Sequence, residues 1–159
     1  MEALPVAAQL APVFGMVTED ADQDGNLDIV MAGNDFGNEV TNGRYDAFNG
    51  LLLKGDGKGN FAAQTPAAAG IFLPGDAKAL AKLTTTGNNF LLAASENRGA
   101  VKVFRNRAPA AGIMRLTNND RYALITLSNG QTRREELYYG CSFLSQSARF
   151  ISTNPHIKK

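Results

Sequence analysis

The sequence predicts an all-β fold, and three observations carry this prediction. Short apolar runs of about five residues recur along the chain, separated by Gly, Asn or Asp, which is typical of strands joined by turns. Apolar residues at helical spacing are scarce, because proline or glycine interrupts the alanine-rich stretches. The 159 residues include 16 glycines, which favours a turn-rich architecture over a helical bundle.

Eight of the apolar runs are expected to form strands. Their residues are 12–17, 27–33, 50–55, 60–64, 78–83, 89–95, 100–106 and 122–128. The first seven runs are expected to form one region, residues 1–106, in which the long polar segment 34–50 is an inserted loop. The segment 106–114 has the composition of a linker, so a second region, residues 107–159, is expected after it.

The opening strands repeat 62 positions later, counted from Gly25-Asn26 to Gly87-Asn88. In both copies the Gly-Asn pair precedes an apolar strand, and a period of this length fits a β-blade that carries an inserted loop. The carboxylates of the first copy are missing from the second. Their places are taken by Lys82, Thr84, Thr86 and Phe90.

A β-hairpin is expected after the repeats, around the dipeptide Asn129-Gly130. Asn-Gly is favoured in a two-residue type I′ turn because both central residues need positive φ. In that register Thr126 would pair with Arg133. The charged block 133–136 is then expected to be the solvated side of the hairpin.

Residues 20–28 read D-A-D-Q-D-G-N-L-D, and their spacing predicts a cation site. Side-chain oxygens at loop positions 1, 3, 5 and 9 and a backbone carbonyl at position 7 can surround a hard cation, and Gly25 permits the sharp turn. Ca²⁺ accepts about 6–8 oxygens in loose geometry whereas Mg²⁺ requires an octahedron, so Ca²⁺ is the predicted ion. The predicted ligands are Asp20, Asp22, Asp24, Asn26 and Asp28.

Two alternatives to a calcium site exist for this loop. An EF-hand loop begins in the same way, but it needs a glutamate at position 12 and a helix on each side. Position 12 here is Met31, within an apolar strand pattern, so the EF-hand is excluded. The other alternative is a solvated acidic turn without metal, which the alternating spacing of the acids disfavours.

The pattern D-x-D-x-D-G-x-x-D followed by an apolar strand resembles the FG-GAP (VCBS-type) repeat of integrin α-subunit propellers and of many bacterial surface proteins. The stretch "FGMVTEDADQDGNLDIVMAGND" is similar to that repeat. "GLLLKGDGKGNF" resembles the strand that closes such a blade, and "KALAKLTTTGNNFLLAASENRGAVKVFRN" resembles a degenerate second blade. "ITLSNGQTRREELYYGCSFLSQSARFI" is similar to the ASPIC/UnbV segment that follows such repeats in the cartilage acidic protein group and its bacterial relatives.

The resemblance implies two β-propeller-type blades in an incomplete ring, followed by a β-hairpin segment. It implies a calcium-stabilised binding or scaffolding module for a protein or glycan, located in the extracellular space, the periplasm or the cell surface. Two blades cannot close a ring, so the chain is expected to be the C-terminal piece of a longer family member or to associate with itself. Open blade edges expose unpaired backbone groups, which favours such association.

The remaining signals argue against an enzyme. His156 is the one histidine and is expected to be solvated, and no Ser/His/Asp set, P-loop or metalloprotease motif is present. The alternative is an accessory part of a hydrolase acting on polysaccharide or phosphate esters. The single Cys141 excludes an intrachain disulfide and is expected to be buried.

Partner classes can also be narrowed. The net charge of +1 gives no general attraction for nucleic acid, and no apolar run is long enough for a membrane span. Segment 34–50 instead offers polar and aromatic side chains suited to a glycan or peptide. The candidate ligand-binding residues are Arg44, Tyr45 and Asp46.

Overall fold

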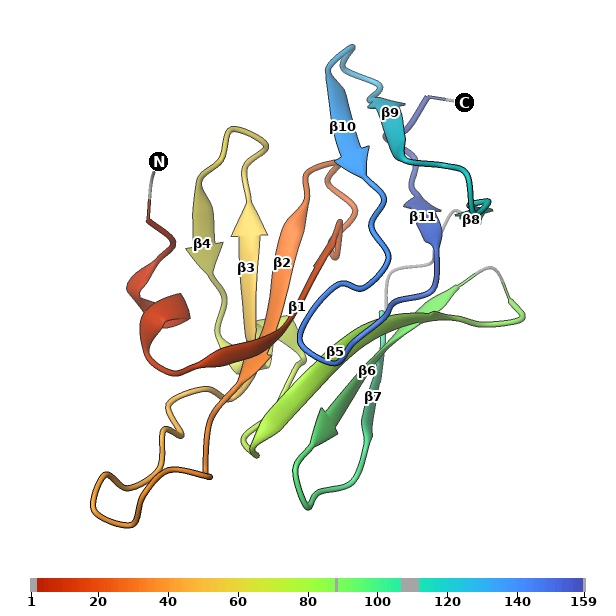
Figure 1. Ribbon diagram of the computed structural model, residues 1–159. Helices are drawn as coiled ribbons and strands as arrows, with labels where there is room; N and C mark the ends of the chain where they lie inside the picture. Colours follow the sequence, from red (N-terminus) through yellow and green to blue (C-terminus); the bar gives the residue numbers. More distant parts are fainter. Residues whose placement is uncertain (1–2, 88, 107–111, 159) are drawn as a thin grey trace.

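The computed structural model describes residues 3–87, 89–106 and 112–158 (Figure 1). Within these residues the chain is all-β with very little helix, as predicted. The elements in chain order are η1 (Val6–Gln9), β1 (Val13–Glu19), β2 (Asp28–Gly33), β3 (Leu51–Gly55), β4 (Phe61–Ala63), α1 (Pro66–Ala69), β5 (Ala77–Thr84), β6 (Phe90–Glu96), β7 (Lys102–Arg105), β8 (Gly112–Arg115), β9 (Tyr122–Thr126), β10 (Thr132–Glu136) and β11 (Phe150–Thr153). All eight predicted strands are confirmed, with bounds shifted by a few residues.

Antiparallel pairing organises the described strands into four sheets. The first sheet has the order β1-β2-β3-β4 and the second has the order β5-β6-β7. Two further ladders pair β9 with β10 and β8 with β11. The repeat seen in the sequence therefore corresponds to two similar meanders, in which β1 and β2 match β5 and β6. Whether these open sheets are blades of a propeller stays a prediction.

The two larger sheets pack face to face, and apolar side chains fill the space between them. Val17, Val30 and Ala32 of the first sheet meet Leu80 and Ala94 of the second. The other face of the first sheet is covered by the N-terminal segment, where Ala8 joins a second apolar cluster. The central strands β2 and β3 are thus covered on both faces, whereas Met16 of β1 and the last two residues of β4 are exposed.

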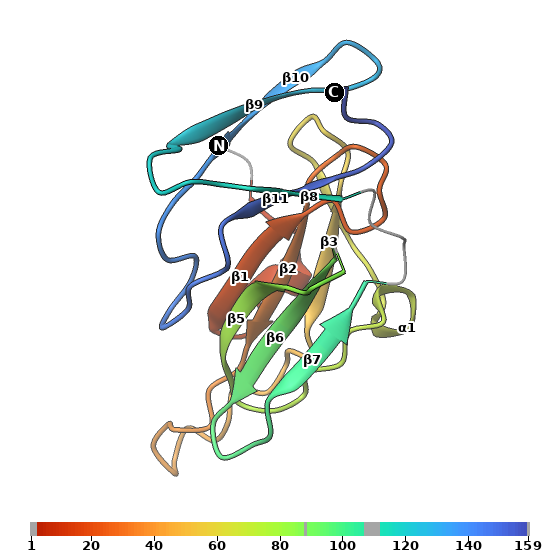
Figure 2. The ribbon, with the colours of Figure 1, turned by 90° about the vertical axis from the view of Figure 1, so that its right-hand side faces the viewer.

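Residues 112–158, named here the C-terminal unit, have an apolar cluster of their own around Ile125, Leu127 and Ile151. The unit lies across one end of the two sheets, beside the turn between β1 and β2 (Figures 1 and 2). Loop 34–50 extends from the opposite end, because β2 runs from one end of the first sheet to the other. The predicted boundary at 106/107 and most of the predicted linker lie outside the described residues.

The predicted hairpin register is wrong by one residue. Thr126 pairs with Thr132 rather than with Arg133. The chain turns through three residues, 128–130, and only Gly130 of these has positive φ (+88°), so the turn is not type I′. A slip of one residue exchanges the two faces of a strand. Arg133 and Glu135 therefore face inward and are half-buried, instead of lying on the solvated side.

Two other sequence predictions concern single residues. Cys141 is exposed, so the prediction that it is buried is wrong; its segment lies along the surface of β5, where Cys141 Sγ is 3.1 Å from Ser147 Oγ. His156 is exposed, as predicted.

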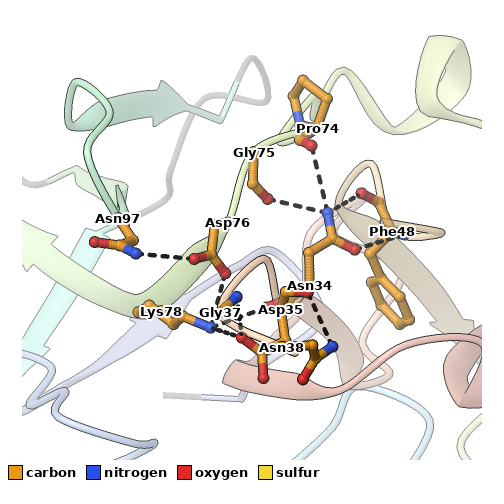
Figure 3. A network of polar contacts seen from close by, with 10 residues as sticks. All are labelled: Asn34, Asp35, Gly37, Asn38, Phe48, Pro74, Gly75, Asp76, Lys78 and Asn97. Atoms are coloured by element: carbon orange, nitrogen blue, oxygen red, sulfur yellow. Dashed lines mark hydrogen bonds and ion pairs between the residues drawn. The ribbon is translucent and has the colours of Figure 1, made fainter. Parts of the chain in front are cut away.

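A buried polar network ties loop 34–50 to the second sheet (Figure 3). Asn34 is fully buried directly after β2, with φ of +88°. Its side-chain amide donates to the carbonyl oxygens of Phe48 at 2.7 Å and Gly75 at 3.0 Å, and its Oδ1 accepts from the backbone N–H of Phe48 at 2.9 Å. Lys78 of β5 donates to the backbone oxygen of Asn34 at 3.1 Å and pairs with Asp76 at 2.7 Å. One side chain thus satisfies backbone groups of two separate segments.

Replacing Asn34 is expected to destabilise the fold. Asn34→Ala leaves buried backbone groups of Phe48 and Gly75 unpaired and puts alanine in a left-handed conformation, so a loss of about 2–4 kcal/mol is expected. Asn38→Ala is the matched control, because the Asn38 side chain makes one long hydrogen bond of 3.4 Å in the same loop. Urea unfolding measures both changes; equal losses in the two variants would contradict the role given to Asn34.

Candidate metal centre

The acidic loop connects β1 to β2 at the end of the first sheet that faces the C-terminal unit. Asp20 follows β1 directly, and Asp28 is the first residue of β2 and pairs with Glu19. The chain between them reverses at Gly25, whose φ of +94° confirms the predicted sharp turn. The two strands therefore fix both ends of the loop, and its carboxylates are held close together.

Three of the predicted ligands form a cluster. Asp20, Asp22 and Asp28 each have a carboxylate oxygen within 4.8 Å of the others. Asp20 and Asp28 are buried, with 5% and 1% of their surfaces exposed, whereas Asp22 opens to solvent. A cluster of carboxylate oxygens, open on one side, can hold a hard cation that retains some water.

Backbone amides hold the two buried carboxylates in place. Asp28 accepts from the backbone N–H of Ala21 at 2.9 Å and from that of Gly55 at 2.9 Å. Asp20 Oδ2 accepts from the backbone N–H of Gly25 at 2.9 Å. The other oxygen of Asp20, Oδ1, is buried and accepts no hydrogen bond from the described residues. A buried, unpaired carboxylate oxygen is unfavourable unless a cation or proton compensates it.

The two other predicted ligands lie beside this cluster. Asp24 Oδ2 is 3.2 Å from Lys54 Nζ of β3, and Asp24 Oδ1 accepts from the backbone N–H of Asn26 at 2.8 Å. Lys54 also pairs with Asp22, and its hydrogen bonds to both carboxylates raise its pKa. The Asn26 side chain lies against Gly57. Lys54 was not anticipated, since the sequence pattern of the loop does not include the neighbouring strand.

Burial makes the ionised form of the carboxylates in this loop unfavourable. Burial raises the pKa of Asp20 from 3.8 to about 6, and the charges of Asp24 and Asp28 add to this, while the backbone N–H of Gly25 and the charge of Arg133 oppose it. Burial likewise raises the pKa of Asp28, against the hydrogen bonds from Gly55 and Ala21. Both shifts favour the protonated form, and a bound cation would reverse them.

Side chains of the C-terminal unit reach the same loop. Asn154 is buried, and its amide donates to Asp20 Oδ2. Arg133 donates to the backbone oxygen of Gly25. These contacts join residues more than 100 positions apart, so no local pattern could have indicated them.

The second copy of the repeat has a short turn in place of the acidic loop. The backbone N–H of Thr85 donates to the backbone oxygen of Asn89 at 2.9 Å and so closes the turn between β5 and β6. Asn88 lies outside the described residues. Lys82, the counterpart of Asp20, is inside β5 and pairs with the buried Glu19 at 2.9 Å. This turn offers no carboxylate to a cation in the described residues.

The candidate ligand-binding residues lie far from the acidic loop, at the opposite end of β2. Arg44, Tyr45 and Asp46 are exposed in loop 34–50. Backbone hydrogen bonds of 2.9 and 3.0 Å pair Tyr45 with Asp35, and the Arg44 guanidinium lies 4.9 Å from the centre of the Phe36 ring. Backbone hydrogen bonds therefore close the base of loop 34–50, and the three side chains are exposed beside it.

No protein-family model, curated protein or solved structure matches this chain. The resemblance to FG-GAP repeats and to the ASPIC/UnbV segment remains a prediction from the sequence motifs. Over the part of the chain that the structure describes, no helix is both long and apolar enough to cross a membrane.

The raised pKa of Asp20 predicts a pH dependence of the cation-free protein. Its folded-state pKa of about 6 exceeds the ordinary 3.8, so the stability it contributes is present below pH 4 and lost as the pH rises through 6. Between about pH 5 and pH 7, the wild-type protein should lose about 1 kcal/mol relative to Asp20→Asn. Urea unfolding of both proteins in chelator-treated buffer measures this difference, and parallel pH profiles would contradict it.

Proposed function

We propose that this chain is a non-enzymatic, calcium-stabilised β module that binds or scaffolds a protein or glycan. The observation that carries the calcium part is the unpaired Oδ1 of Asp20, which is buried among the carboxylates of Asp22 and Asp28. Proteins rarely bury a carboxylate oxygen without a partner. A cation in this loop would give it one.

The ligand set favours calcium over smaller or softer ions. The donors are oxygens only, which suits Ca²⁺, Mg²⁺ or Mn²⁺ rather than zinc or copper. Asp22 is exposed, so water can complete an irregular shell around the ion. Ca²⁺ tolerates such geometry, whereas Mg²⁺ requires a near-ideal octahedron. A site that is open to water on one side fits the higher calcium concentrations found outside the cytoplasm, which agrees with an extracellular, periplasmic or cell-surface location.

The role of calcium in this proposal is structural. The loop joins β1 to β2, contacts β3 through Gly55, and contacts the C-terminal unit through Asn154. Neutralising the carboxylates of Asp20 and Asp28 would remove the repulsion that opposes these contacts. The ion would therefore stabilise the place where three parts of the chain meet.

Ligand recognition is assigned to loop 34–50. Tyr45 is half-exposed, and Arg44 and Asp46 flank it with opposite charges. An aromatic ring beside a guanidinium and a carboxylate can stack on a sugar or an aromatic side chain while it forms polar contacts. The acidic loop lies at the other end of β2, so calcium and ligand would act at separate places.

Calcium is expected to raise the melting temperature of the wild-type protein by about 3–10 °C at millimolar concentration, because an ion that binds only the folded state stabilises it. Asp20→Asn should abolish the rise. Asp46→Asn should preserve it, since Asp46 is an exposed carboxylate at the opposite end of β2. Differential scanning calorimetry with calcium and with chelator gives both answers, and a wild-type melting curve indifferent to calcium would overturn the calcium proposal.

The binding surface can be tested on arrays of glycans and peptides. Any array ligand that binds the wild-type protein should bind Tyr45→Ala at least about tenfold more weakly, as expected for loss of an aromatic anchor. Tyr138→Ala is the control, because Tyr138 is an exposed tyrosine of the C-terminal unit. Equal binding by both variants would exclude loop 34–50 as the surface, and no binding of the wild-type protein to either array would count against a glycan or peptide ligand.

A further inference from the structure

The C-terminal unit contacts the two sheets through Ser152 on Glu19, through Phe150 on Phe90, and at two further places, of which the first is the acidic loop. Asn154 donates to Asp20, and Arg133 donates to the backbone oxygen of Gly25. The His156 side chain packs against Gly25. A Cβ atom on residue 25 would lie 3.4 Å from the Cβ of His156. The unit therefore contacts both the carboxylate and the turn that a cation would fix.

The second place is formed by the free edges of β1 and β5. Each of these strands ends its sheet, so one edge of each has no strand partner. We call the free edge of β1 and the free edge of β5 the inner edges. Hydroxyl groups of the segment 142–148 accept hydrogen bonds from backbone N–H groups of the inner edges. Backbone atoms of the segment form further hydrogen bonds with the same edges. The bonds run from Met16 to Ser142 at 2.8 Å, from Leu80 to Ser145 at 3.2 Å, from Lys82 to Ser147 at 2.9 Å, and from Ala148 to the Lys82 oxygen at 2.7 Å.

These serines explain how the inner edges avoid pairing with another chain. An exposed strand edge is a template for association, and proteins commonly cover it. Here the cover is a loop segment whose hydroxyl groups contact alternate residues of β5, Leu80 and Lys82. Hydroxyl-to-backbone contacts at a surface are individually weak. The cover also includes a backbone hydrogen bond and a ring contact between Phe143 and Phe14, and the contacts that hold the C-terminal unit elsewhere add to it.

We propose that cation binding in the acidic loop and docking of the C-terminal unit are coupled, so that the cation keeps the inner edges covered. The inference rests on the proposed function of the loop as a calcium site. The buried Oδ1 of Asp20, which accepts no hydrogen bond from the described residues, belongs to a loop that Asn154 and Arg133 contact directly. Asn154 and Arg133 need Asp20 and the Gly25 carbonyl in fixed positions. A cation bound by Asp20 would hold its carboxylate in the position that Asn154 contacts, which favours the docked arrangement.

Coupling of this kind is reciprocal. If calcium strengthens docking, then weakening the docking contacts must weaken calcium binding, even where the altered residues do not contact the loop. Ser145 and Ser147 provide this test, because their hydroxyl groups bind β5 rather than the acidic loop. A role limited to orienting Asp20 would involve Asn154 alone. Variants in the two sets of contacts therefore distinguish coupling from a role of Asn154 that is limited to orienting Asp20.

The experiment uses the full chain with calcium chloride as the probe. Hydrogen exchange of the wild-type protein should show that calcium slows the amides of Met16, Leu80 and Lys82 by about fivefold or more relative to chelator. Calorimetric titration should show that the double variant Ser145→Ala/Ser147→Ala binds calcium at least about fivefold more weakly. Asn154→Ala should lose about 10–100-fold. The exposed Asn119→Ala should bind calcium like the wild-type protein.

Each outcome decides between the two proposals. Calcium binding that is unchanged in the double serine variant, together with unchanged exchange at the inner edges, overturns the coupling and leaves the calcium site intact. Absence of calcium binding in the wild-type protein overturns both. The exchange measurement needs no variant, so it decides the question even if a substituted protein fails to fold.

Discussion

Charge balance at the turn between β1 and β2 is the constraint on which the rest of the structure depends. Asp20 and Asp28 are buried there, and Asp22 lies beside them. Like charges in a poorly hydrated place destabilise one another unless a counter-charge is close. Lys54 supplies one, but it pairs with Asp22 and Asp24 on the exposed side. Asp20 Oδ1 is buried and accepts no hydrogen bond from the described residues, so it is the oxygen at which a cation would act.

Two polar clusters, one at each end of β2, then hold the fold together. The acidic loop at the start of β2 joins the first sheet to the C-terminal unit. Asn34, directly after β2, joins loop 34–50 to the segment that leads into the second sheet. Between them, the interface of the two sheets is filled by apolar side chains that include Val30, Leu80 and Ala94. Polar contacts at the two ends and apolar packing between them therefore act together on the orientation of the sheets.

Much of the fold and the core of the site were predictable, because both are local in sequence. The alternation of apolar runs and turns gave all eight expected strands, and the spacing of Asp20, Asp22 and Asp28 indicated a cluster that the structure shows. What local patterns could not show depends on distant contacts. The short strands β8 and β11 pair across more than 30 residues, and Asn154 reaches Asp20 from the far end of the chain. The hairpin register failed because a three-residue turn places Arg133 inward, toward the acidic loop.

The most direct test of this account is a crystal structure of the full chain from crystals grown with calcium chloride. Anomalous differences would be measured at a long wavelength, where calcium scatters anomalously. The account predicts one strong anomalous peak in the acidic loop, bound by Asp20, Asp22 and Asp28, with Asp20 Oδ1 among its ligands. Lys54 should then have moved away from Asp22, because a bound dication repels its ammonium group. A loop without an anomalous peak at saturating calcium, with Lys54 still paired to Asp22 and Asp24, would contradict the account.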